Sequence, residues 1–247
     1  MACWHGQIDI LNRLLELPES RLDVNIQDDR GKTGFHVACW HGHINIVNRL
    51  LELPDARLDV NIRDDRGETA IFTLCYYGHL DIINRLLELS EERMNLIIHD
   101  YSLGRNIKSV FHLACYLGNL AIVNRLLELP DERLDINMKD HLRRTGFDVA
   151  CEHGRLPVVK RLLEVARTRH IDVDYGLRLA YHFGHADVVA AIRQYFTWKL
   201  CSCCIPYPLF PARLFSPITF LVTAAYSVRD FCIVCADMYN REWTGYE

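Results

Sequence analysis

Hydrophobic and polar positions follow one another along most of the chain in blocks that suit pairs of short helices. The longer block spans residues 44–53, and its apolar positions share one helical face: Ile44, Ile46, Val47, Leu50, Leu51 and Leu53. A shorter apolar block, FHVACW at 35–40, precedes it across Gly42. Pro54 ends the longer block, because the residue before a proline disfavours the α conformation. The pattern predicts two helices joined by a turn, and nothing in it favours a sheet.

Polar, turn-forming residues join each predicted helix pair to the next. In DDRGKT at 28–33, Gly31 permits a positive φ, and Thr33 is a suitable N-cap for the helix that follows. Asp59 and Asn61 can form local hydrogen bonds on the return segment. Two turns depart from this plan: HDYSLGRNIKS at 99–109 is longer by four residues, and Arg143 replaces the turn glycine in the fifth copy.

The helix pair recurs at a nearly constant interval. The glycines that end the first helices are 36, 36, 40, 36 and 30 residues apart: Gly6, Gly42, Gly78, Gly118, Gly154 and Gly184. Residues 5–31 and 41–67 are identical at 21 of 27 positions, which indicates duplication. We predict a repeat array over 1–197, with units at about 1–27, 28–63, 64–99, 100–139, 140–173 and 174–197, and a Cys/Pro-rich apolar tail over 198–247.

The repeated unit resembles the ankyrin repeat, whose usual pattern is D-x-x-G-x-T-P-L-H-x-A-A, then G-H, I-V, L-L and D-V-N. The chain has DDRGKTGFHVAC at 28–39, GH at 42–43, IV at 46–47, LL at 50–51 and DVN at 59–61. The match extends over about residues 2–196. The resemblance implies an all-α solenoid of stacked helix-turn-helix units, about five to six in number with a truncated first unit. Because no turn precedes the first helix, we expect Ile10, Leu11 and Leu14 to be partly uncovered.

Two positions of the family pattern vary between copies. The proline is replaced by Gly34, Ala70, Val110 and Gly146, which weakens the helix starts. The motif histidine is kept as His36 and His112 but becomes Phe72 and Asp148. We therefore expect the hydrogen bonds between repeats to be non-uniform.

The cysteines of the repeats are predicted to be core residues. The segment ACWHG at 38–42 places Cys39 close to several histidines, but equivalent cysteines recur at Cys3, Cys75, Cys115 and Cys151. In the resembled repeat Cys39 replaces a small buried alanine, where a thiol packs as a small hydrophobe. The residue three before the cysteine changes from copy to copy, so no constant metal partner exists. We predict neither a metal site nor a cofactor, and Cys201, Cys203 and Cys204 are badly spaced from Cys232 and Cys235 for zinc.

Composition and motifs exclude several classes of function. A chain with 28 basic and 32 acidic residues has no broad basic surface for a phosphate backbone, so we predict no nucleic-acid partner. A nucleophile elbow, a phosphate-binding glycine loop and a HExxH helix are not found in the sequence. Arginine and glutamate recur three apart on the second helix, as in Arg49 and Glu52, which is typical of a solvated face. We predict that the protein is not an enzyme.

The resemblance implies that a partner binds at the turn tips and the concave side of the first helices, on the two residues before each glycine. These are Trp4, His5, Trp40, His41, Tyr76, Tyr77, Tyr116, Leu117, Glu152, His153, His182 and Phe183. The turn tips add Asp29, Arg30, Lys32, Asp65, Arg66 and Glu68, with His141 and Arg144 further along. Exposed aromatic rings in a row favour a protein interface, and the alternative is that each ring only covers its neighbour's backbone. The mixed charges favour a protein partner, and the histidines predict an affinity that changes between pH 7 and about 5.5.

The tail leaves three alternatives open. The segment ITFLVTAAYSVRDFCIVCADMY at 218–239 is apolar but interrupted by Arg229 and Asp230. It could form a buried helical cap, a membrane-associated tail acylated at the nearby cysteines, or a drifted reading frame. The leading hypothesis for the whole chain is a non-enzymatic scaffold that binds a protein on its concave aromatic face. The alternatives are an adaptor anchored to a membrane by the tail and a degenerate fragment without activity.

The unpaired cysteines and the absence of a signal peptide before Trp4 predict a cytoplasmic protein. Near-identical ankyrin copies are frequent in intracellular bacteria and large viruses, which makes a host-cell cytosol the alternative location.

Overall fold

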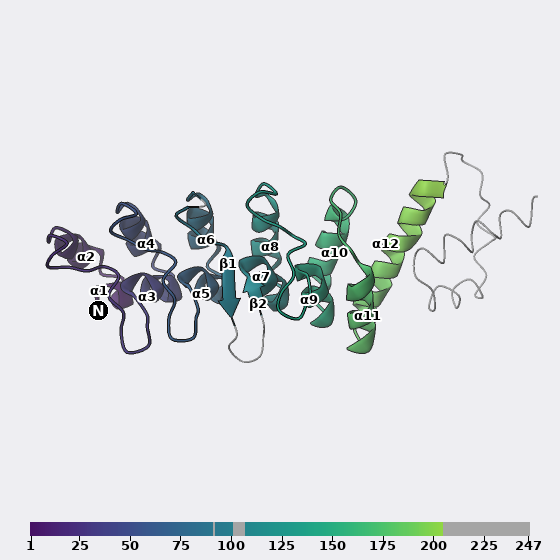
Figure 1. Cartoon of the computed structure of the whole chain (residues 1–247), viewed down its shortest axis with the longest axis horizontal. Helices are drawn as coiled ribbons and strands as arrows, with labels where there is room; N and C mark the ends of the chain where they lie inside the picture. Colours follow the sequence, from purple (N-terminus) through teal and green to yellow (C-terminus); the bar gives the residue numbers. More distant parts are fainter. Residues whose placement is uncertain (91, 101–106, 205–247) are drawn as a thin grey trace, which may run out of the picture.

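The computed structural model describes residues 1–90, 92–100 and 107–204, and shows two parallel rows of helices (Figure 1). The first helix of each pair lies in one row: α1 (Ala2–His5), α3 (Gly34–His41), α5 (Ala70–Tyr77), α7 (Val110–Leu117), α9 (Gly146–Glu152) and α11 (Asp174–His182). The second helices form the other row: α2 (Ile8–Leu15), α4 (Ile44–Leu51), α6 (Leu80–Leu87), α8 (Leu120–Leu127), α10 (Leu156–Val165) and α12 (Ala186–Cys204). The fold is an all-α repeat solenoid, as predicted.

The core is a continuous layer between the two rows. Phe35, Phe111 and Phe147 occupy the same position in three first helices, and each is almost completely buried. The apolar positions of the second helices, such as Ile46 and Ile82, complete the layer. Each helix packs mainly on its partner within the repeat and on the equivalent helix of the next repeat. Stability therefore arises from contacts between neighbouring units.

The hydrogen bonds that cap the first helices depend on which residue stands at the position of the motif histidine. The Thr33 hydroxyl accepts a hydrogen bond from the His36 amide, and the His36 ring accepts one from the Thr33 amide, which confirms the predicted cap. At α9 Asp148 replaces the histidine: its carboxylate accepts a hydrogen bond from the Thr145 amide, and the Thr145 hydroxyl accepts one from the Asp148 amide. At α5 the motif residue is Phe72, which has no polar side-chain atom to return. There Thr69 makes no side-chain cap bond and its buried hydroxyl has no partner among the described residues.

The glycines that follow α1, α3, α7 and α9 make room for a side chain of the next repeat. Gly42 has φ +69°, and a Cβ there would lie 2.7 Å from the His79 ring. His79 Nε2 in turn lies 3.2 Å from the Trp40 carbonyl oxygen, to which it donates. The GH pair of the motif thus links consecutive units. In the fifth turn Arg143 adopts φ +62°, the conformation that glycine has at Gly31 and Gly67.

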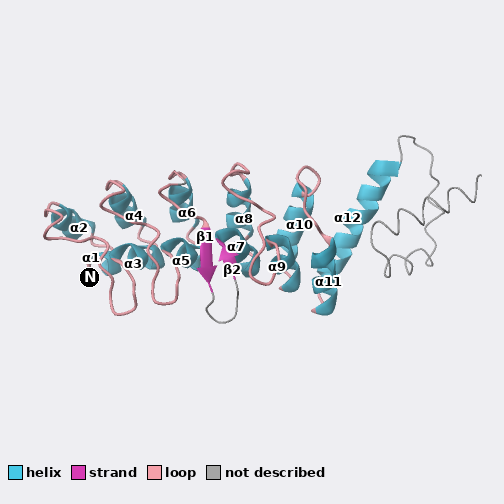
Figure 2. Cartoon of the chain, in the orientation of Figure 1, coloured by secondary structure: helices cyan, strands magenta, loops and turns pink. Residues whose placement is uncertain are grey.

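The long third linker forms a short antiparallel hairpin, which corrects the expectation that no part of the chain is a sheet. Strands β1 (Ile97–Asp100) and β2 (Ile107–Ser109) pair Ile97 with Ser109 and Asp100 with Ile107 (Figure 2). Val110, the first residue of α7, also donates to the Leu96 carbonyl, at 3.0 Å.

The outer row carries polar links between repeats. Four predicted Arg–Glu pairs form at 2.7–3.1 Å: Arg49–Glu52, Arg85–Glu88, Arg125–Glu128 and Arg161–Glu164. In addition, Arg49 donates to Asn12 of the preceding repeat at 2.8 Å, and Arg161 donates to Asn124 at 2.8 Å. The sequence pattern indicated only a solvated face for these arginines, and it did not predict this second role. Predicting this role requires knowing which residues neighbouring helices bring together.

The ends of the array differ in part from expectation. Ile10 and Leu14 on α2 are exposed as expected, whereas Leu11 is buried, because it faces the core between α1 and α2. Helix α12 passes the predicted boundary at 197 and ends at Cys204. Residues 198–204 of the predicted tail thus continue α12, and its residues 205–247 lie outside the described residues. Among the described helices, none has the length and apolar character needed to cross a bilayer.

Candidate partner-binding surface

The candidate surface is built from the last residues of each first helix, immediately before the glycine. We call this set the inner row: Trp4, His5, Trp40, His41, Tyr76, Tyr77, Tyr116, Leu117, Glu152, His153, His182 and Phe183. A left-handed glycine follows each pair, and a histidine or arginine of the next repeat bonds the carbonyl of Trp4, Trp40, Tyr116 or Glu152. Because the anchoring is on the backbone, the side chains themselves stay available for other contacts.

In the first three repeats the inner row forms a continuous series of rings, here called the aromatic ladder: Trp4, Trp40, His41, Tyr76 and Tyr77. The Trp4 and Trp40 ring centroids are 6.5 Å apart, and those of Trp40 and Tyr77 are 6.1 Å apart with planes only 22° apart. Trp4 and Tyr77 nevertheless remain 49% and 50% exposed. The rings therefore support one another along the array while each offers an open surface to solvent.

His41 lies in the middle of this ladder. Its ring meets the edge of Trp4 at 4.6 Å and stacks against His43 at 5.7 Å. Desolvation, together with the nearby imidazoles of His43 and His5, lowers the pKa of His41 below its ordinary value. His41 is thus neutral at pH 7. Whether charging the inner-row histidines changes the affinity for a partner stays a prediction.

The turn tips lie beside the ladder and differ in how accessible they are. Asp29, Arg30, Asp65 and Arg66 are exposed, and Glu68 is half-buried. Lys32 bends over the Trp40 ring, with Nζ 4.2 Å from the centroid and 3.7 Å from the Asp64 carboxylate. Lys32 is therefore a support for the ladder as well as a candidate contact residue.

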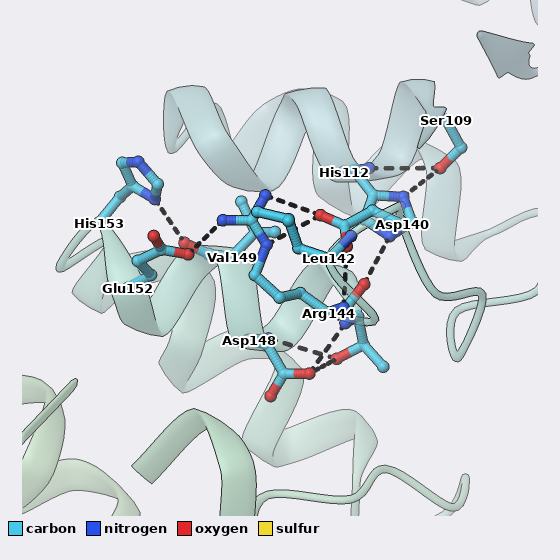
Figure 3. Close-up of polar contacts among 10 residues, drawn as sticks. Ser109, His112, Asp140, Leu142, Arg144, Asp148, Val149, Glu152 and His153 are labelled. Carbon is cyan, nitrogen blue, oxygen red and sulfur yellow. Dashed lines mark hydrogen bonds and ion pairs between the residues drawn. The ribbon is translucent and has the colours of Figure 1, made fainter. Parts of the chain in front are cut away.

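The fifth repeat carries different chemistry at the same two positions. Arg144 corresponds to Lys32 and Glu152 to Trp40, and these two residues form an ion pair (Figure 3). Arg144 also pairs with the Asp140 carboxylate at 2.7 Å and is only 7% exposed. The expectation that Arg144 is a turn-tip contact residue is therefore wrong, because two carboxylates draw its guanidinium inward.

Beyond the fourth repeat the inner row is less regular. Tyr116 meets the edge of the His153 ring at 4.5 Å, and His182 meets Phe183 at 5.0 Å. Leu117 is half-buried beside Tyr116. Tyr181, next to His182, is among the most exposed aromatic residues and was not predicted, because the motif has a small buried residue at its position.

Behind the inner row, motif residues form hydrogen bonds that differ from repeat to repeat, as expected. His112 Nδ1 lies 2.7 Å from the Ser109 hydroxyl, and Nε2 lies 3.2 Å from the Arg144 carbonyl oxygen in the next turn. This arrangement suits a neutral ring, and burial lowers the pKa of both His112 and His36. The network confirms that hydrogen bonds between repeats are non-uniform.

The repeat cysteines are part of the core. Cys39, Cys75, Cys115 and Cys151 are buried, and desolvation raises the pKa of each thiol far above its ordinary value. A thiol that stays protonated is neither a good nucleophile nor a good metal ligand. Within 1–90, 92–100 and 107–204, the structure contains no cluster of three or more His, Cys, Asp or Glu residues able to hold a metal ion.

Helix pairs of this shape, stacked on a 36-residue interval, define a helical repeat protein. Residues 1–100 match the family model described as ankyrin repeats in three copies. The crystal structure of the human ASB11 ankyrin repeat domain is similar to this chain, with a TM-score of 0.60 and 24% sequence identity over 78% of this chain and 81% of that chain. A search of the curated proteins gave no match. Residues 1–100 are therefore ankyrin repeats, and the helix pairs continue in the same arrangement to residue 204.

The repeats matched over residues 1–100 have a known class of function. Ankyrin repeats are generally protein–protein interaction modules and are typically not enzymes. The inner row suits that role, because rings, imidazoles and mixed charges provide apolar contact and hydrogen bonds to another protein.

Proposed function

We propose that this protein is a non-enzymatic scaffold that binds a partner protein on the aromatic ladder and the adjoining turn tips. The observation that carries the proposal is a row of rings in mutual contact that are still about half exposed at Trp4, Tyr76 and Tyr77. Exposed aromatic residues that cluster in this way are common among the residues that dominate binding energy. Their contacts with one another also hold the rings in place before binding, which lowers the entropic cost of association.

The charges beside the ladder favour a protein over a polyanion. Arg30 and Arg66 are exposed next to Asp29 and Asp65, so neither sign prevails along the turn tips. Such alternation selects a partner by local pairing rather than by a long-range field. We further propose a cytosolic location. The five described repeat cysteines are free thiols, as expected in a reducing compartment.

The proposal is tested by photo-crosslinking in the cells that express the chain. A benzophenone amino acid is placed at Tyr77 on the ladder or, as a matched control in the same repeat, at the exposed Asp81 on α6. Position 77 should give a discrete covalent adduct with one or a few proteins, identified by mass spectrometry, and position 81 should not. Equal adducts at both positions, or an adduct at position 81 alone, would place the interface elsewhere.

A further inference from the structure

One ionisable side chain, His41, lies between two rings of the aromatic ladder. Its ring centroid is 4.6 Å from that of Trp4 and 6.0 Å from that of Trp40, and the His41 and Trp40 planes are only 11° apart. His41 is exposed, whereas Trp40 is half-buried. A ligand that covers neighbouring rings of the ladder therefore also covers His41.

The His41 ring has hydrogen-bonding capacity that the protein does not use. In a neutral imidazole, one nitrogen is a donor and the other carries an acceptor lone pair. Within the part of the chain that the structure describes, His41 makes ring contacts but no side-chain hydrogen bond. His43 differs, because its Nε2 donates to the Trp4 carbonyl oxygen at 3.1 Å. His41 thus offers a polar contact to a ligand in the middle of an apolar surface.

The ionisable groups around His41 disfavour its charged form. Desolvation, and then the imidazoles of His43 and His5, lower the pKa of His41. No carboxylate of the described residues is among the groups that shift this pKa. On the side of the next repeat, the neighbouring ionisable groups are Tyr77 and His79, which stack on each other at 6.3 Å. A proton on His41 would therefore meet further imidazoles and no compensating negative charge.

A cation–π contact does not offset this effect. The Lys32 ammonium already lies 4.2 Å from the Trp40 ring centroid. An imidazolium at His41 would bring a second cation to the same indole, and the two positive charges would repel each other. The Asp64 carboxylate does not compensate for the new charge, because Lys32 and two backbone amides of its own turn already occupy its oxygens.

We propose that the aromatic ladder holds its ligand through neutral His41, and that acidification to about pH 5.5 weakens this binding. The inference rests on the proposed function, because it takes the ladder as the binding surface. A ligand on the ladder removes water from the His41 ring and donates to its acceptor lone pair, and both effects oppose protonation. Below the pKa of His41, binding therefore expels one proton, and the affinity falls as the pH falls.

The size of the effect has a ceiling. The pKa of His41 in the free protein lies below its ordinary value of 6.5, so the affinity is constant well above that pH and decreases below it. A single imidazole with the ordinary pKa would change the affinity about tenfold between about pH 7.5 and 5.5. The expected change is therefore several-fold and no greater than about tenfold.

The test uses the full chain and N-acetyl-tryptophanamide, an aromatic probe whose charge does not change with pH. NMR titration at about pH 7.5 should show saturable binding with a Kd of about 1–10 mM, and the Kd at about pH 5.5 should be several-fold larger. With saturating probe, the titration midpoint of the His41 ring resonances should also move to lower pH. Circular dichroism at each pH verifies that the chain is folded.

Variants assign the effect to one residue. His41→Gln keeps a donor and an acceptor but takes up no proton, so its Kd should stay within about twofold of the wild type at about pH 7.5 and should not change with pH. His182→Gln, in the inner row but outside the ladder, is the matched control and should keep the wild-type pH dependence. His5→Gln should keep most of it. Trp40→Ala/Tyr77→Ala should weaken probe binding at least about tenfold, which locates the probe on the ladder.

Four results would overturn the inference: no saturable binding at about pH 7.5, the same Kd at both pH values, a pH dependence that survives in His41→Gln, or one that is lost in His5→Gln. The proposed function fails by a different result, which is the lack of a discrete adduct at position 77. An adduct together with pH-independent probe binding would refute only the role of His41. Probe binding that depends on pH without an adduct would refute only the proposed function.

Discussion

At the scale of single residues, the repeats show what happens when one motif position changes while its surroundings stay the same. The fifth turn keeps the backbone of a glycine turn, but the residue in the left-handed conformation is Arg143. A side chain with a Cβ is strained there by about 1–2 kcal/mol. The turn persists because Asp140 still organises it, accepting hydrogen bonds from the Leu142 and Arg144 amides at 2.8 Å each.

Arg143→Gly should therefore stabilise the protein. Relief of the backbone strain outweighs the extra freedom that glycine gives the unfolded chain, for a net gain of about 0.5–1 kcal/mol. The unfolding midpoint should rise by about 2–4 °C, measured by circular dichroism. Arg66→Gly, one residue before a turn glycine, is the control and should destabilise slightly. A lower midpoint for Arg143→Gly would show that the arginine side chain makes a larger contribution than the strain removes.

The direction in which a side chain points could not be predicted from the sequence at this turn position. Lys32 and Arg144 occupy the same turn position and look alike in the sequence. Lys32 covers a tryptophan, while Arg144 is buried between two carboxylates, because the residue eight positions later is Trp40 in one repeat and Glu152 in the other. The motif identified the position correctly, but the partner across the turn decides where the charge goes.

At the scale of elements, the start of α3 depends on a reciprocal cap that requires a neutral histidine. His36 Nδ1 faces the Thr33 amide, a fixed donor, at 3.2 Å. If His36 Nδ1 were protonated, its N–H would face the Thr33 N–H, and two donors would oppose each other. A hydroxyl that can rotate also lies near each ring, that of Thr33 at 2.9 Å from His36 Nδ1 and that of Ser109 at 2.7 Å from His112 Nδ1, whereas the Thr33 amide cannot turn away.

This cap predicts a pH-dependent stability. Burial lowers the pKa of His36 below its unfolded value of 6.5, so the unfolded chain binds the proton first. The contribution of the neutral ring is present above the unfolded pKa and is lost as the pH falls below it. His36→Gln keeps an acceptor at this position without a titration.

The measurement is the unfolding midpoint of both proteins between about pH 7.5 and 5.5. The wild type should lose about 3–5 °C more than His36→Gln over this interval. If the difference between the two midpoints stays constant with pH, the cap does not sense the charge of His36.

The hairpin of β1 and β2 shows the limit of element prediction in a repeat. The helices on either side of the hairpin could be predicted, because each copy repeats the same pattern of apolar and turn residues. The added segment occurs in one copy only, so no comparison with other copies was informative, and its pairing depends on the two arms meeting across the turn.

At the scale of the whole molecule, the units are joined by links that recur with the repeat. His43 and His79 bond the carbonyl oxygens of Trp4 and Trp40 in the preceding unit. Arg57, in the loop after α4, reaches back to the Leu15 and Leu17 carbonyls, at 3.3 and 3.1 Å, where helix α2 leaves its last acceptors free. Such links hold successive first helices at a constant offset, which is why the inner-row side chains align.

The architecture was largely predictable from the sequence, and the surface was predictable only in part. A motif with several staggered positions fixes which residues precede each glycine, so the members of the inner row could be named in advance. Their mutual contacts could not. The 6.1 Å approach of Trp40 to Tyr77 and the covering of Trp40 by Lys32 depend on how the repeats pack together.

The central claim is that the aromatic ladder is the surface that binds the partner. The most direct measurement is the Kd of the crosslinked partner, once purified, for the wild type and for two double variants. Trp40→Ala/Tyr77→Ala removes two ladder rings, and Asn45→Ala/Asp81→Ala removes two exposed side chains from the second helices. The ladder variant should bind about 100-fold or more weakly, and the control should stay within about threefold of the wild type. A ladder variant that binds as tightly as the wild type would contradict the account.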